Sequence, residues 1–263
     1  MANPAIDTVT ATVTAAAAGG SAAAAVLGDS LALRSTGSRI RLLNAWIDTD
    51  ALGFVQITSP KLHDNTRGIR LRTTVHQPFP LLPYETMQDL FPVDALAVTI
   101  ASAAGAGKID NLCMLLYYDD LQGPSGRYLS VGDLEKRRAE TVTVEFSLAP
   151  TAGNIYSTAT AITGLSDLLK RGSDYVLVGY KVDTEATAIT IRGADTGNLR
   201  IGMPCDPAGG FYTGSWFYDL SLYTNLALMP MFAANNSPGI FIELVSNDLL
   251  ATVKGSLIFV RVQ

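Results

Sequence analysis

Residues 37–58 read GSRIRLLNAWIDTDALGFVQIT, and residues 172–192 read GSDYVLVGYKVDTEATAITIR. Both stretches begin with Gly-Ser. Both later reach an Asp-Thr pair followed by an acidic residue and Ala, at 48–51 and at 183–186, so one offset of 135 residues relates them. Self-similarity at a fixed offset is typical of a repeated structural unit. The sequence therefore predicts two copies of one fold.

Further matches keep the same order along the chain. They pair Ile69-Arg70-Leu71 with Leu199-Arg200-Ile201, Asp89-Leu90 with Asp219-Leu220, and Thr8-Val9-Thr10 with Thr141-Val142-Thr143. Between the copies, residues 119–140 are dense in Gly, Pro, Ser and charge, as in a connector. We therefore expect a first domain over residues 1–120 with an Ala-rich arm at about 1–26, a linker over 121–140, and a second domain over 141–263.

Each copy is predicted to consist of short strands. In the first copy Leu43, Ala45 and Ile47 alternate with Leu42, Asn44 and Trp46, which is the periodicity of a strand. Val178, Tyr180 and Val182 repeat it in the second copy. Other runs rich in β-branched and aromatic residues include AVTIA, IFIEL and SLIFVRV.

Helix signals are weak, at 84–91, 131–140, 165–171 and 214–220. Many short strands with regular turns favour an all-β fold. At about 120 residues per copy, we expect two tandem eight-stranded jelly-roll β-sandwiches related by internal duplication.

Composition excludes several functional classes. The 263 residues are 48% hydrophobic and 16% charged, which favours a folded core, and the formal net charge is −5. Nonspecific binding to nucleic acid needs dense Lys and Arg, so we expect no direct nucleic-acid partner. The two cysteines are expected to be free thiols, because a disulfide framework would need more. We see no secretory signal and no apolar run long enough to span a membrane.

Two enzyme-like motifs fail on inspection. Gly28-Asp29-Ser30-Leu31 resembles the nucleophile block of the GDSL esterases, but the chain has only two histidines, His63 and His76, and none near the C-terminus to serve as base. The stretch SAAGAGKID (102–110) lacks the Gly and the hydroxyl residue that a phosphate loop requires. We predict no catalytic residue, no cofactor and no enzyme activity.

A few side chains are candidates for binding. The carboxylates Asp48, Asp50, Asp183 and Glu185 could bind calcium, although we favour solvated turn residues and expect no metal. Trp216 and Phe217 are candidate subunit-interface aromatics, because aromatic side chains dominate both cores and interfaces. Arg70 and Arg200, which recur at matched positions, are candidates for ion pairs between subunits.

Two fused β-sandwiches of this size, an Ala-rich start and almost no catalytic side chains resemble the double jelly-roll major capsid proteins of tailless, membrane-containing bacteriophages, such as corticoviruses and tectiviruses. The resemblance implies a structural protein of the virion that forms pseudo-hexameric homotrimers, which tile an icosahedral shell. Its implied partners are neighbouring capsomers and an internal membrane or minor capsid proteins.

Other functions stay open at this point. One is a phage decoration or receptor-binding protein, or a lectin-like tandem β-sandwich. Another is an enzyme on a β scaffold, for instance a glycosidase with paired carboxylates, since the spatial pairing of Asp and Glu is invisible in the sequence.

Overall fold

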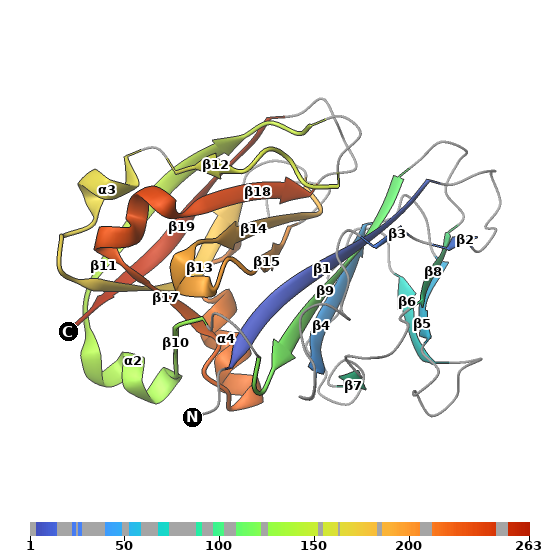
Figure 1. The fold of residues 1–263 in the computed structure, drawn as a ribbon, viewed down its shortest axis with the longest axis horizontal. Helices are drawn as coiled ribbons and strands as arrows, with labels where there is room; N and C mark the ends of the chain where they lie inside the picture. The colour runs from blue at the N-terminus through green and yellow to red at the C-terminus, as the bar shows by residue number, and fades with distance from the viewer. Residues whose placement is uncertain are drawn as a thin grey trace.

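The fold is known from a computed structural model. It describes residues 4–14, 23–24, 26–27, 40–48, 53–58, 68–73, 88–90, 97–102, 109–121, 126–151, 155–162, 164–182, 186–205, 212–245 and 252–263. The chain folds into antiparallel β-sheets with short helices, as Figure 1 shows. The all-β sandwich fold expected from the sequence is confirmed.

The first half of the chain forms two antiparallel sheets. Sheet 1A has the order β3-β1-β9-β4-β7, and its strands are β1 (Ala5–Thr14), β3 (Val26–Leu27), β4 (Ile40–Asp48), β7 (Gln88–Leu90) and β9 (Ile109–Tyr118). Sheet 1B has the order β2-β8-β5-β6, and its strands are β2 (Ala23–Ala24), β5 (Gly53–Thr58), β6 (Ile69–Thr73) and β8 (Ala97–Ser102).

The second half also forms two sheets. Sheet 2A has the order β10-β17-β13-β19-β11, with β16 paired to β13, and its strands are β10 (Tyr128–Leu129), β11 (Arg138–Leu148), β13 (Asp174–Val182), β16 (Tyr212–Thr213), β17 (Met229–Ala233) and β19 (Val253–Val262). Sheet 2B has the order β12-β18-β14-β15, and its strands are β12 (Thr160–Ala161), β14 (Ala188–Arg192), β15 (Ile201–Pro204) and β18 (Phe241–Val245).

The two halves share one strand order. When β3, β10 and β16 are set aside, the described residues of each half contain eight strands. Numbered along the chain, they run 1-8-3-6 in sheets 1A and 2A and 2-7-4-5 in sheets 1B and 2B. Strand β1 therefore corresponds to β11, β4 to β13, β5 to β14, β6 to β15, and β9 to β19.

A β-bulge recurs at the same place in both halves. Strand β4 carries an extra residue against β9 between Leu42 and Asn44, and β13 carries one against β19 between Leu177 and Gly179. The second bulge stands 135 residues after the first, which is the offset of the sequence repeat. Because an extra residue reverses the alternation of side chains, the unbroken alternation predicted over 42–47 is wrong.

Apolar side chains from facing sheets fill each sandwich. The first core includes Val9, Ile47, Val55, Val98, Ile100 and Met114, and the second includes Val144, Phe146, Tyr180, Ile189, Ile191 and Phe259. Burying one such side chain stabilises the fold by about 1.5–3 kcal/mol. The second core also takes in residues from the outward face of β1, β4 and β9, so the two halves are in contact.

Three short helices lie where the sequence indicated them: α2 (Val131–Arg137), α3 (Leu165–Leu168) and α4 (Trp216–Thr224). The described part of the chain also contains the 3-10 helices η2 (Ala194–Thr196) and η3 (Ala234–Gly239). The helix expected over 84–91 is wrong at 88–90, which form strand β7. The match of Asp89-Leu90 with Asp219-Leu220 fails as well, because the former pair lies in a strand and the latter in α4.

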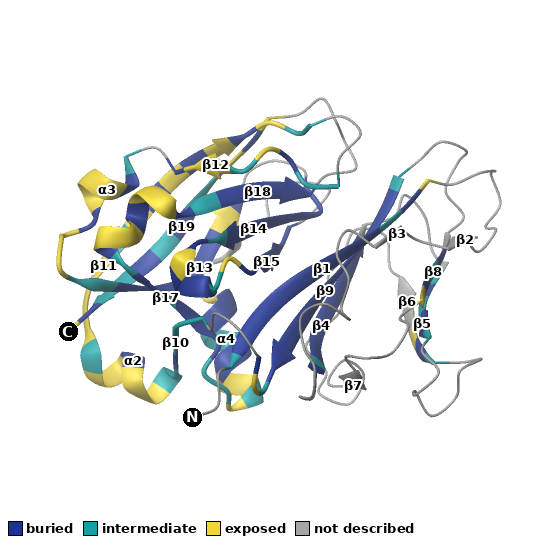
Figure 2. Ribbon diagram, viewed as in Figure 1, coloured by how far each residue is buried: buried dark blue, intermediate teal, exposed yellow. Residues whose placement is uncertain are grey.

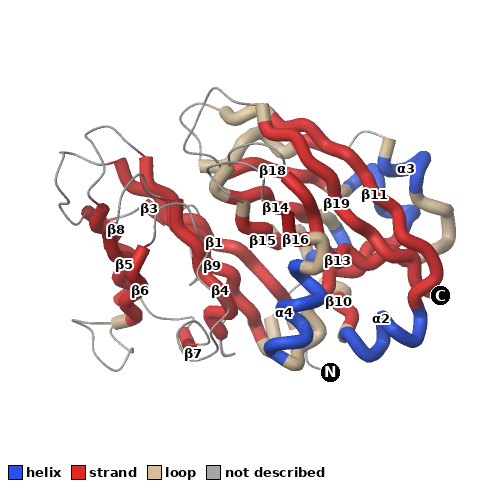
Figure 3. The backbone as a smooth tube through the Cα atoms, turned by 180° about the vertical axis from the view of Figure 1, so that it is seen from behind, coloured by secondary structure: helices blue, strands red, loops and turns tan. Residues whose placement is uncertain are grey.

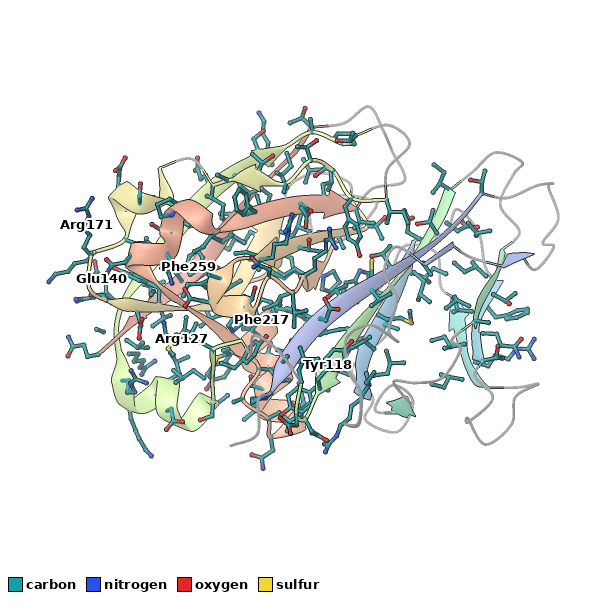
Figure 4. All side chains as sticks on the ribbon, viewed as in Figure 1. Tyr118, Arg127, Glu140, Arg171, Phe217 and Phe259 are labelled. Atoms are coloured by element: carbon teal, nitrogen blue, oxygen red, sulfur yellow. The ribbon has the colours of Figure 1, made fainter. Side chains whose placement is uncertain are left out.

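The end of the expected linker belongs to the second half. Strand β10 pairs with β17, and α2 leads directly into β11. Arg127, beside β10 (Figure 4), donates from Nη1 to Asp174 Oδ1 at 3.1 Å and forms an ion pair with Asp195 at 3.4 Å. The boundaries of the two domains stay a prediction. Within the described part of the chain, no helix is both long and apolar enough to cross a membrane.

Candidate assembly interface

The contact between the two halves buries much of the outward face of β1, β9 and β4 in sheet 1A. Strands β1, β9 and β4 stand between sheet 1B and the second half, as Figures 1 and 3 show from opposite sides. Several outward residues of these strands are at most 2% exposed, among them Ile6, Leu43, Trp46, Cys113 and Leu115. Figure 2 shows β1 buried over almost its whole length. Sheet 1A therefore has apolar side chains on both faces, one for its own sandwich and one for its neighbour.

Two tryptophans meet at this contact. The rings of Trp46 in β4 and Trp216 in α4 lie edge to face, with centroids 6.4 Å apart. The indole Nε1 of Trp46 donates a hydrogen bond to the carbonyl oxygen of Thr187 at 3.2 Å. Trp216, which we expected at a contact between subunits, thus packs within the chain. The neighbouring Phe217 is fully buried in the second core, where Figure 4 labels it, so it is not available to another subunit.

Two backbones approach closely at Gly202. The N–H of Gly202 in β15 donates to Thr8 Oγ1 of β1 at 2.7 Å. A Cβ atom at position 202 would lie 2.6 Å from Thr8 Oγ1 and 2.8 Å from Thr8 Cγ2, so only glycine fits unless Thr8 moves. Nearby, the hydroxyl of Tyr156 donates to Thr10 Oγ1 at 3.0 Å. Alternate threonines of β1 thus serve as polar contacts in an otherwise apolar face.

A small ionic network borders the contact. Glu243 in β18 is 3% exposed and accepts hydrogen bonds from the Nε atoms of Arg200 at 2.8 Å and Arg192 at 3.1 Å. The backbone N–H of Arg200 donates to Asp7 Oδ1 at 3.2 Å, and its guanidinium lies 4.0 Å from the ring centroid of Tyr156. Arg200, expected in an ion pair between subunits, makes its ion pair inside the chain.

Two tyrosine hydroxyls are held neutral at this contact. Burial is the main cause that raises the pKa of Tyr156 above its ordinary value, and the hydrogen bond to Thr10 opposes it. Burial likewise raises the pKa of Tyr128, whose hydroxyl accepts a hydrogen bond from the N–H of Ile6 at 3.0 Å. Both side chains are therefore neutral, hydrogen-bonded parts of the contact at physiological pH.

Arg70 differs from the other three interface candidates because it is exposed. It lies in β6 on the outer face of sheet 1B, with its guanidinium 4.1 Å from the ring centroid of Phe54. Strand pairing also shows that Arg70 and Arg200 do not occupy equivalent positions in the two halves. Arg70 lies opposite Gln56 within the ladder, whereas Arg200 stands one residue before β15 begins.

The calcium candidates are not tested by the fold. The side chain of Asp48, at the end of β4, and residues 50, 183 and 185 lie outside the described residues. Among the residues with described side chains, no three His, Cys, Asp or Glu gather into a group that could hold a metal ion. The absence of a metal site and of catalytic activity stay predictions.

The sequence analysis missed residues that form hydrogen bonds between the two halves, namely Asp7, Thr8, Thr10, Tyr156 and Gly202, and it missed Glu243, which binds Arg200 beside them. One usable signal was Gly202, because a glycine inside a strand often marks close approach of another backbone. The remaining residues carry no such signal, since their partners are more than 40 positions away in the sequence.

Because known proteins show only weak similarity to this chain, its function is inferred from its geometry. No family model and no curated protein match the chain. Among solved structures, the PBSX exported protein XepA aligns at 10% identity over 95% of this chain and 84% of that chain, with a TM-score of 0.22. The infectious bursal disease virus VP2 subviral particle aligns at 11% identity over 100% and 72%, with a TM-score of 0.20. Scores this low establish no common fold.

Proposed function

We propose that the chain is a structural protein of a virion, a major capsid protein built from two jelly rolls that arose by duplication. The observation that carries the proposal is the repetition of one eight-strand order, with a bulge at the same place, in two halves packed against each other.

The strand order supports the jelly-roll assignment. In each half strand 1 pairs with 8, 3 with 8 and 6, 2 with 7, and 4 with 5 and 7. The pairs 1–8, 2–7, 3–6 and 4–5 are those of one long hairpin that has been rolled up into two facing sheets. Rolled in this way, eight strands give the jelly roll, a fold common in capsid proteins.

The contact between the halves supports assembly. It joins sheet 1A of one sandwich to sheet 2B of the other, so the two sandwiches use different faces. A contact of this head-to-tail kind leaves one complementary face free at each end, and repeating it forms a ring when the rotation closes. Three chains then supply six similar sandwiches, a pseudo-hexameric block that can tile an icosahedral shell.

The partners follow from this role. The homotrimer contacts neighbouring capsomers, and an internal membrane or minor capsid proteins lie beneath it. A formal net charge of −5 disfavours direct packing of the genome. In this proposal no residue is catalytic, and the protein is located in the virion.

The test is the native mass of the purified full chain, by light scattering or native mass spectrometry, with negative-stain imaging of the same sample. We expect trimers or closed shells. A strict monomer at high concentration would overturn the proposal and favour a tandem β-sandwich binding protein, which glycan arrays can examine.

A further inference from the structure

We propose that the outer face of β11 and β19 in one copy binds the outer face of β5 and β6 in the next copy, with Glu145 beside Arg70. This inference rests on the proposed assembly function, and it names the two faces and the charge pair that select the partner. The contact inside the chain serves as the template for it.

The first step matches sheets 1A and 2A residue by residue. Thr8 of β1 shares a row across the sheet with Asn44, the residue that follows the bulge in β4. Thr143 of β11 shares a row with Gly179, the residue that follows the bulge in β13. Thr143 therefore occupies in the second half the position of Thr8 in the first, so the sequence match of Thr8 with Thr141 is wrong by two residues.

The second step matches sheets 1B and 2B. The ladder between β5 and β6 ends with Ile57 opposite Ile69, next to the connection between the strands. The ladder between β14 and β15 ends in the same way, with Ile191 opposite Ile201. All four side chains are buried, so they point into their own sandwiches. The next residue along β6 is Arg70, and the next along β15 is Gly202, and both positions point outward.

The third step applies the contact inside the chain to the contact between two copies. Within the chain the N–H of Gly202 meets the side chain of Thr8. The corresponding pair between two copies is Arg70 and Thr143. In the contact inside the chain, Gly202 packs directly against Thr8. In the contact between copies, the long side chain of Arg70 takes the place of Gly202. Arg70 must therefore extend along the partner's strand β11.

The charges on β11 and its neighbours give Arg70 one nearby partner. From the rise per residue and the spacing of strands, Glu145 lies about 7 Å from Thr143, whereas Lys181 lies about 12 Å and Lys254 about 14 Å away. Glu145 is exposed and makes no ion pair among the described residues. The nearest charge that Arg70 meets on this face is therefore opposite to its own.

The outer face of β11 and β19 is also open to receive a partner. Thr143 and Ile258 are exposed or half-exposed, whereas their counterparts Thr8 and Leu115 are fully buried. Beside them a hollow of about 390 Å³ lies between α2 and α4, and its floor includes Val178. Val178 is 8% exposed, and Leu43, at the same position in the first half, is 1% exposed against the second half. Continuity with the contact inside the chain thus favours a second copy as the occupant.

The experiment reverses each charge and measures native mass against concentration. Glu145→Arg places two cations together, and Arg70→Glu places two carboxylates together. We expect each variant to raise the dissociation constant of the trimer at least about tenfold. The double variant, in which the pair is exchanged, should recover the trimer. Recovery also shows that neither substitution prevents folding.

Controls separate this inference from the function on which it rests. Asp167→Lys, on the exposed surface of α3, changes charge by the same amount away from both faces and should leave the trimer intact. A wild-type monomer would overturn the assembly function itself. A wild-type trimer that both reversals leave unchanged would overturn only the assignment of these two faces.

Discussion

Substituting Gly202 by alanine probes the contact between the two sandwiches at its tightest point. The new Cβ would lie 2.6 Å from Thr8 Oγ1, 2.8 Å from Thr8 Cγ2 and 3.1 Å from Thr8 Cβ. These separations are below any normal van der Waals contact, and β1 cannot retreat easily because its other face packs into the first core. One half must therefore shift against the other, or Thr8 must leave its rotamer.

The expected cost follows from this overlap. Overpacking a well-packed contact by one methyl group costs about 1–3 kcal/mol. A chain of this size loses about 2–4 °C of melting temperature per kcal/mol, so Gly202→Ala should lower the Tm by roughly 2–12 °C. Thermal unfolding followed by circular dichroism measures the shift.

A double-mutant cycle identifies the cause. Thr8→Ala removes both overlapping atoms but also the acceptor of the Gly202 N–H, which costs about 1–3 kcal/mol if that donor stays unpaired. Once Thr8 is alanine, adding Gly202→Ala should cost much less than it does alone. A matched control is Gly132→Ala in α2, where a Cβ has no neighbour within 4 Å and alanine favours the helix.

Two results would refute the reasoning. One is an unchanged Tm for Gly202→Ala. The other is strict additivity of the two substitutions, because residues in contact must couple if the overlap is real.

Three further outcomes follow from the same contact and from the linker. Trp46→Ala should cost about 3–5 kcal/mol and remove the near-ultraviolet dichroism of the Trp46–Trp216 pair, as urea unfolding and spectroscopy can measure. Tyr156 has a pKa raised above its unfolded value of 10.0, so its contribution to stability is complete below about pH 10 and is lost as the pH rises further. Tyr156→Phe should therefore reduce the fall in unfolding free energy as the pH rises above about 10. Arg127→Ala should cost about 1 kcal/mol, because the ion pair with Asp174 is partly exposed and screened.

These outcomes have matched controls. Phenylalanine in place of Tyr223, which is 66% exposed, should leave the alkaline unfolding profile unchanged. An alanine in place of Arg171, on the exposed turn before β13, should leave stability within about 0.5 kcal/mol of the wild type. If Trp46→Ala unfolds at the same urea concentration as the wild type, the two halves do not stabilise each other.

Local sequence patterns predicted the strands well because each strand is specified by its own alternation. They also predicted helices at 131–140 and 214–220, where the structure has α2 over Val131–Arg137 and α4 over Trp216–Thr224. They failed at 84–91, where QDL carries a helix-like composition but pairs with β4 as a strand. Pairing with a distant strand is a tertiary effect, and it overrides weak local preference.

The candidate site was harder to predict. Arg200 and Trp216 were predicted as residues of a contact between subunits, and the sequence could not show that they make contacts inside one chain. The matching of Arg70 with Arg200 also failed by two residues. A slip of two keeps side chains on the same face of a strand, so hydrophobic pattern alone gives no warning of it.

The bulge at Leu43 has a consequence for how the strand evolves. Before it, Leu42 faces the first core, and after it Trp46 faces the neighbouring sandwich, although the two residues are separated by an even number of positions. The alternation of inward and outward side chains along β4 therefore shifts by one residue at the bulge. Deleting Leu43 would restore a regular ladder, in which Trp46 still lies opposite Cys113 and faces the neighbouring sandwich while Ile47 stays in the first core. The end of β4 after the bulge is therefore under selection for two partners at once, because Ala45 and Ile47 pack in the first core and Trp46 packs against the neighbouring sandwich.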